Sequence, residues 1–111
     1  MARSLQVRLD DITGAIAGID AIIDGVDFQT FTQSWPMQRA VERGLEIISD
    51  ATRGIPDDRK LEHPEVLWMQ IAGIGNILRH EDRPVEPVIV WNITQTHLPN
   101  LGQAVRRMLP N

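Results

Sequence analysis

Apolar residues recur every three or four positions along most of the chain, which is the spacing of an amphipathic helix and not the alternation of a strand. Residues 4–25 show this spacing most clearly, with Ser4 suited to be the N-cap and Gly25 suited to end the helix. The steps alternate between four and three residues, as in the seam of a helix bundle. The seam consists of Leu5, Leu9, Ile12, Ile16, Ile19, Ile23 and Val26.

Two more helices are predicted in the next stretch of chain. Asp27 is a second N-cap, and it precedes a short helix at residues 28–33 that we expect to bury Phe28 and Phe31. Residues 35–53 form the following long helix, because a proline is tolerated in its first turn and a glycine follows its last residue. Its inner stripe is expected to consist of Met37, Val41, Leu45, Ile48 and Ala51.

The second half of the chain predicts a loop and two helical regions. Residues 55–64 combine prolines with charged residues, which is typical of a loop with room for one turn. Residues 65–80 form a helix, and residues 86–109 form a last helical region. Pro99 must kink or break that region, because proline lacks a backbone donor and crowds the preceding turn. Its inner side is expected to carry Val88, Trp91, Leu98, Leu101, Val105 and Met108.

The absence of strand-like alternation predicts an all-α fold. Four long helical segments with short connections favour an antiparallel up-and-down bundle of four to five helices, in which sequence neighbours pack side by side. The chain has 111 residues, so we expect residues 1–111 to form a single domain. A chain of this size buries roughly two thirds of the surface that its unfolded form exposes, and it needs no disulfide to fold.

Composition narrows the possible chemistry. The chain has no cysteine, which excludes disulfides, thiolate nucleophiles and thiolate metal sites and fits a reducing compartment. The formal net charge of −4 argues against broad attraction to nucleic acid and leaves room only for a local basic site. No apolar run resembles a signal peptide or reaches membrane-spanning length, so a soluble, cytoplasmic protein without membrane contact is expected.

The candidate chemistry gathers in residues 71–83, IAGIGNILRHEDR, where polar groups end an otherwise apolar segment. On a helix Gly75, Asn76, Arg79 and His80 lie on one side, because residues three and four apart share a face. A histidine titrates near neutrality and both takes and gives protons, while an arginine binds phosphate through two parallel hydrogen bonds. The buried side is expected to consist of Ile71, Ile74, Ile77 and Leu78.

Each of these polar residues also has a plain structural interpretation. His80 is equally a surface histidine at a helix end, where the macrodipole favours its charged form, and Arg79 and Asn76 are equally solvated side chains. A metal site is not expected, because His63, His80 and His97 provide no pair of ligands one helical turn apart. No cofactor is expected either.

Small and aromatic residues nearby add little chemistry. Gly73 and Gly75 form an incomplete phosphate-loop pattern with no preceding strand, so we expect them to let another helix come close. Trp35, Trp68 and Trp91 are expected to be core or interface anchors, because no basic cluster lies between them.

Several segments together resemble one known family. They are WMQIAGIGNILRHED at residues 68–82, VWNI at 90–93 and LPNL at 98–101, with LEII at 45–48 and HPE at 63–65. The sequence from about residue 38 to residue 101 is therefore similar to the HepT-like branch of the HEPN superfamily. This resemblance implies a small helical bundle that dimerises. Many members are RNA-cleaving toxins that pair with a small nucleotidyltransferase antitoxin.

The active motif of that family is Arg, four residues, His, one residue, Tyr. His80 stands at the histidine position, whereas Gly75 stands at the arginine position and Asp82 at the tyrosine position. Arg79 follows Gly75 by one turn, and helical side chains lean toward the N-terminus, so its guanidinium is expected to fill the space at Gly75. Asp82 either repels the substrate phosphate or holds His80 in one tautomer and raises its pKa. The chain contains no tyrosine, so a partner cannot silence it by modifying one.

The resemblance implies a metal-independent endoribonuclease of the HepT-like toxin type, acting in a toxin–antitoxin pair. His80, Arg79 and Asn76 are the candidate catalytic residues, and Arg83 and Asp82 are the candidate substrate-binding residues. RNA is the expected substrate, and a cognate nucleotidyltransferase antitoxin is the expected partner. A helix end alone makes a shallow site, so two copies of residues 71–83 are expected to face each other across a homodimer.

Two alternatives stay open. The departures at Gly75 and Asp82 suit a non-catalytic binding subunit that partners a small nucleotidyltransferase. A plain helical interaction module, anchored on a partner through Trp68 and Trp91, fits the same bundle pattern.

Overall fold

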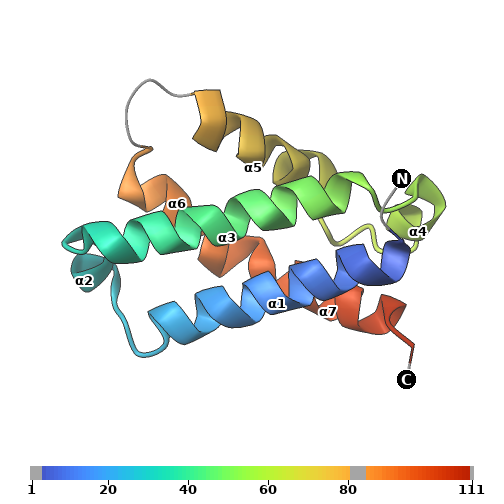
Figure 1. The fold of residues 1–111 in the computed structure, drawn as a ribbon, viewed down its shortest axis with the longest axis horizontal. Coiled ribbons are helices and arrows are strands. Elements are labelled where there is room, and N and C mark those ends of the chain that lie inside the picture. The colour runs from blue at the N-terminus through green and yellow to red at the C-terminus, as the bar shows by residue number, and fades with distance from the viewer. Residues whose placement is uncertain (1–3, 81–84, 111) are drawn as a thin grey trace.

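The computed structural model describes residues 4–80 and 85–110, except for the side chain of His80. Within these ranges the chain forms seven helices and no strand (Figure 1). The helices are α1 (Leu5–Ile23), α2 (Phe28–Thr32), α3 (Trp35–Arg53), α4 (Asp57–Leu61), α5 (Trp68–His80), α6 (Pro87–Thr96) and α7 (Leu98–Met108). The predicted all-α fold is confirmed. The short helix α2 was expected, whereas α4 within the predicted loop and the division of the last region raise the number of helices in the described residues above the expected four to five.

The long helices form an up-and-down bundle with α3 at its centre. Helix α1 packs along one side of α3 and α5 packs along the other, while α6 and α7 complete the bundle beside α1 and α3 (Figure 1). Chain direction reverses from α1 to α3, from α3 to α5, and again from α5 to the α6–α7 pair. Helix α5 packs mainly against α3, so much of its surface faces outward.

The core follows the predicted stripes of α1 and α3. The apolar stripes of α1 and α3 pack against each other. Helix α7 adds a third row of buried apolar side chains to this core. The fully buried members include Leu9, Ile12, Ile19, Val41, Leu45, Ile48, Leu101, Ala104 and Val105.

Capping side chains start the helices where the sequence predicts. The Ser4 hydroxyl accepts a hydrogen bond from the backbone N–H of Val7, and the Asp27 carboxylate accepts one from Thr30 N–H at 2.8 Å. Gly25 has a φ of 71°, a left-handed conformation that favours glycine, and α1 ends just before it. These local signals are confirmed.

One helix boundary differs from the prediction and another agrees with it. Helix α5 begins at Trp68 rather than at residue 65, because the Trp68 indole N–H donates to the carbonyls of Lys60 and His63 and the preceding segment turns back to provide them. The expected break near Pro99 is confirmed, and it falls at His97. Proline then occupies the first turn of α7, where a backbone donor has no partner within the helix.

Three apolar side chains expected inside the bundle lie outside it. Phe28 is 38% exposed and lies against Trp91 with ring centroids 6.0 Å apart, while Phe31 of the same short helix is fully buried. Ile77 is 44% exposed, because α5 turns its other face toward α3. Val88 is 46% exposed in the first turn of α6, and that helix instead buries Val90 and Ile93.

Candidate functional site

The contact between α3 and α5 is built around a buried serine. Ser49 of α3 donates its hydroxyl to the carbonyl oxygen of Ala72 at 2.8 Å and accepts the backbone N–H of Gly75 at 3.0 Å. A Cβ atom added at Gly75 would lie only 2.9 Å from Ser49 Oγ. The expectation that Gly75 lets another helix come close is confirmed. For Gly73 it is wrong, because an added Cβ there would meet no atom within 4 Å.

Arg79 folds back over Gly75. A Cβ atom at Gly75 would lie 3.1 Å from each of the two terminal nitrogens of Arg79. The Arg79 side chain is exposed, and its Nη2 also donates to Oδ1 of Asn76 at 3.4 Å. The guanidinium therefore stands where the sequence analysis expects it, in the space that a glycine leaves at position 75. Its catalytic role stays a prediction.

A second arginine reaches the same place from α3. Arg53 donates through Nη2 and Nε to the carbonyl oxygen of Ala72, at 2.8 and 3.3 Å, and through Nη2 to Oδ1 of Asn76 at 3.3 Å. Sequence analysis missed this residue, because it stands on another helix, far from residues 71–83 in the sequence. Only the packing of α3 against α5 brings Arg53 and Asn76 together.

Asn76 links the two arginines. Its amide oxygen accepts from both Arg53 and Arg79, and this orientation is the one that two guanidinium groups require, because they only donate hydrogen bonds. The side chain is exposed. The structure thus brings Asn76 and Arg79 together as predicted and adds Arg53 to them.

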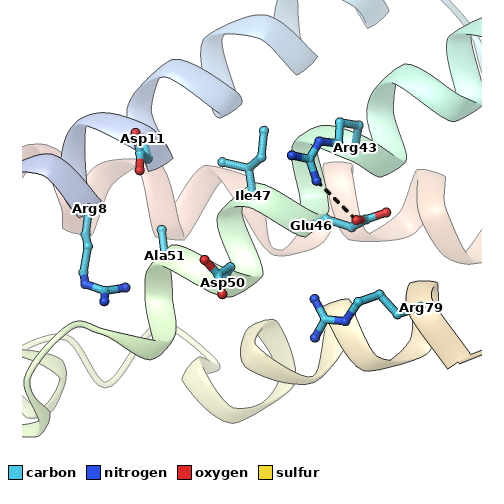
Figure 2. A pocket seen from close by; sticks show the side chains of 8 residues that line it. All are labelled: Arg8, Asp11, Arg43, Glu46, Ile47, Asp50, Ala51 and Arg79. Carbon is cyan, nitrogen blue, oxygen red and sulfur yellow. Dashed lines mark hydrogen bonds and ion pairs between the residues drawn. The ribbon is translucent and has the colours of Figure 1, made fainter. Parts of the chain in front are cut away.

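A mixed-charge hollow of about 220 Å³ lies beside this group, over α3 and between α1 and α5 (Figure 2). Figure 2 shows Arg79 reaching from α5 toward α3 at its edge. Arg43 pairs with Glu46 at 3.4 Å, and both residues line the hollow. The lining residues are Arg8, Asp11, Arg43, Glu46, Ile47, Asp50, Ala51 and Arg79.

The other predicted site residues are only partly placed. His80 is the last residue of α5 and directly follows Arg79, so its backbone lies at the end of the same helix. Asp82 and Arg83 lie outside the described residues. Across residues 4–80 and 85–110, no cluster of three or more potential metal ligands was found, and no helix is both long and apolar enough to span a membrane.

The fold and these residues define an all-α bundle of the HEPN type, with an arginine and a histidine adjacent at the end of an outer helix. Residues 12–108 match the model of the family described as "Ribonuclease HepT-like". The chain therefore belongs to the HepT-like family.

Several relatives are similar over most of the chain. A protein of Thermococcus cleftensis, named as a probable ribonuclease HepT, is 35% identical over 101 residues, which cover 91% of this chain and 92% of the relative. A candidate RNase of Caldanaerobacter subterraneus is 32% identical over 87 residues, 78% of each chain. One of Methanocaldococcus jannaschii is 28% identical over 103 residues, 93% of this chain and 94% of the relative. No solved structure matches the chain at a significant level.

Proposed function

We propose that this protein is a metal-independent endoribonuclease. The observation that carries the proposal is the position of the Arg79 guanidinium, which covers Gly75 at the place where the family motif has its arginine. Membership of the HepT-like family and the names of the relatives support RNA as the substrate.

The proposed reaction is cleavage of an RNA phosphodiester by its own ribose. His80 takes the proton of a 2′-hydroxyl, and the 2′-oxygen attacks the adjacent phosphorus. The bond from phosphorus to the 5′-oxygen breaks, and that oxygen receives the proton that His80 took, which leaves a 2′,3′-cyclic phosphate and a 5′-hydroxyl. Arg79 stabilises the negative charge that gathers on the phosphoryl oxygens in the transition state, and Asn76 holds the guanidinium in place. Arg83 and Asp82 complete the proposed substrate site.

Cleavage in the presence of a chelator tests this proposal. Divalent metal ions are chelated with EDTA. The purified protein is then incubated with RNA and, in parallel, with DNA of the same sequence. The proposal predicts RNA products ending in a cyclic phosphate, no DNA cleavage, and loss of activity in His80→Ala. Cleavage that persists in His80→Ala, or that requires added metal, would contradict it.

We also propose that the active form is a homodimer in which two copies of residues 71–83 face each other. The outward face of α5 supports this arrangement, because Met69 is 89% exposed, Ile77 is exposed, and the space beside Gly73 is open. Burial of such an apolar face is the ordinary driving force for association. Analytical ultracentrifugation at micromolar concentration checks this, and a clean monomer would rule out the shared cleft.

A toxin–antitoxin pairing in the cytoplasm belongs to the same proposal. The proposed partner is a small nucleotidyltransferase, as the family resemblance implies. Without a tyrosine the chain offers no phenolic hydroxyl for modification, so the antitoxin would have to act by binding or on another residue. Co-expression tests this: the partner restores growth that the protein alone suppresses. Equal growth with and without the partner would contradict the pairing.

The second candidate is a non-catalytic subunit that binds the nucleotidyltransferase. The glycine at position 75 favours it, because the family motif has an arginine there. This candidate predicts a stable complex with the partner and no cleavage of RNA by the unmutated protein in the chelator assay above.

A general interaction module receives less support from the structure. The Trp68 indole donates to two carbonyl oxygens of its own chain, and Trp91 packs against Phe31 with ring centroids 5.2 Å apart. Both tryptophans are half-buried within the bundle, so each offers only part of its ring to a partner.

A further inference from the structure

Arg53 differs from the other arginines of α3 and α4 in what it contacts. Three others on α3 and α4 pair with a glutamate three residues further along their own helix, at 2.6 to 3.5 Å: Arg39 with Glu42, Arg43 with Glu46 and Arg59 with Glu62. Arg53 instead crosses from α3 to α5 and bonds a backbone carbonyl and an amide oxygen, both of which are neutral. No carboxylate of the described residues lies within ion-pair distance of it.

Arg53 and Arg79 converge on one acceptor. Both donate to Oδ1 of Asn76, at 3.3 and 3.4 Å, so two guanidinium groups that form no ion pair within the described residues meet at a single amide. Like charges at this separation repel each other, and an anion bound beside them relieves the repulsion. Within residues 4–80 and 85–110, Nη1 of Arg53 and the amide nitrogen of Asn76 have no protein acceptor, which leaves both as donors toward solvent.

The order of these groups along α5 sets their distance from the proposed chemistry. The Arg53 head lies between the levels of Ala72 and Asn76, which is one to two helical turns, or roughly 6–12 Å, before His80. The Arg79 guanidinium folds back to the level of Gly75 and Asn76, about one turn before His80. The Arg53 guanidinium also reaches the Ala72 carbonyl, a further turn away from His80, so Arg53 lies nearer to the neighbouring position of an RNA strand that follows the helix.

We propose that Arg53, together with the Asn76 amide, binds the RNA phosphate next to the one that is cleaved, and so sets the path of the strand along α5. This inference rests on the proposed function for its choice of ligand. Arg53 is then a substrate-binding residue whose loss weakens RNA binding and leaves the rate of the bound complex nearly unchanged. Arg79, in contrast, acts on the reacting phosphate.

The test measures binding separately from cleavage. A short labelled 2′-O-methyl oligoribonucleotide of mixed sequence has no reactive hydroxyl, and its affinity is measured by fluorescence anisotropy over a series of salt concentrations. Arg53→Gln is expected to weaken binding on the order of tenfold, and to reduce the slope of log K against log salt by about 0.7, the value for one single-strand phosphate contact. Arg107→Gln is the matched control, because Arg107 lies on α7, which packs against α1 and α6. It should change neither quantity.

Two further measurements distinguish a role of Arg53 in binding phosphate from a purely structural role in holding α3 against α5. Arg53→Lys keeps the charge but loses the forked contact with the Ala72 carbonyl, so it should keep most of the salt slope. Cleavage of unmodified RNA at saturating protein should proceed within about threefold of the wild-type rate in Arg53→Gln. An unchanged affinity and slope in Arg53→Gln would overturn the proposal. It would also be overturned if Arg53→Lys lost binding as completely as Arg53→Gln.

The cleavage assay tests the endoribonuclease proposal, and the binding assay tests the phosphate site at Arg53, so either proposal can fail without the other. If the unmutated protein leaves RNA intact but Arg53→Gln still weakens binding and lowers the slope, the endoribonuclease proposal fails and the phosphate site stands. If the protein cleaves RNA and Arg53→Gln binds as the wild type does, the phosphate site alone fails.

Discussion

The Arg79 guanidinium covers Gly75, so that a Cβ atom added to the glycine would lie 3.1 Å from both terminal nitrogens of the arginine. On the other side the same Cβ would lie 2.9 Å from the buried hydroxyl of Ser49. The space around Gly75 is therefore filled by the side chains of Ser49 on α3 and Arg79 on α5. This arrangement explains how a chain with glycine at the motif position still has a guanidinium group at that place.

Replacing Gly75 with alanine should destabilise the protein. Ser49 cannot withdraw without losing its bonds to Ala72 and Gly75, so the added methyl group must separate α3 from α5. The expected cost is about 1–3 kcal/mol in the free energy of unfolding, measured by urea denaturation. Gly73→Ala is the matched control on the same helix, where the added Cβ meets open space, and it should be stabilising by about 0.5–1 kcal/mol. Equal stability of the two variants would contradict the close contact at Gly75.

Removing the Ser49 hydroxyl should also destabilise the protein, because the serine is fully buried and bonds α5 twice. Ser49→Ala is expected to cost about 1–3 kcal/mol. It also removes the atom that Gly75→Ala would strike, so the double variant should be more stable than the sum of the single costs predicts. A double-mutant cycle by urea denaturation measures this coupling. Strict additivity would mean that the serine and the glycine do not constrain each other.

Acid should weaken the start of α2 through Asp27. The backbone N–H of Thr30 donates to its carboxylate and lowers the pKa of Asp27 below the ordinary value of 3.8. Because the pKa is lower in the folded state, this stabilisation is complete above the unfolded value and is lost as the pH falls through the folded one. Asp27→Asn keeps a capping side chain that does not titrate. Thermal unfolding from about pH 6 to pH 3 should therefore show a smaller loss of stability in Asp27→Asn than in the wild type. Identical losses would contradict this assignment.

Local signals in the sequence predicted most of the fold because they act over a single helical turn. The caps at Ser4 and Asp27 and the stop near Gly25 each depend on a few neighbouring residues. Burial was predicted less well where a helix contacts only one neighbour. Ile77 fits an apolar stripe of α5, yet α5 packs mainly against α3, and the stripe is wider than that contact.

The candidate site was predictable only along one helix. The spacing of Asn76 and Arg79 places them on a common face, and the backward lean of helical side chains places the Arg79 guanidinium over Gly75. Arg53 was not predictable, because its contact with Asn76 depends on the register between α3 and α5. The Ser49 hydroxyl between Ala72 and Gly75 fixes that register, and no pattern within either helix reveals it.

The central claim is that Arg79 supplies the arginine of a metal-independent RNA-cleaving site. The most direct test is the single-turnover rate of RNA cleavage in EDTA, compared between the wild type, Arg79→Ala and the control Arg107→Gln. Loss of one group that stabilises transition-state charge costs about 10²–10³-fold in rate. The account predicts that loss in Arg79→Ala and a wild-type rate in Arg107→Gln. Cleavage by Arg79→Ala at the wild-type rate would contradict it.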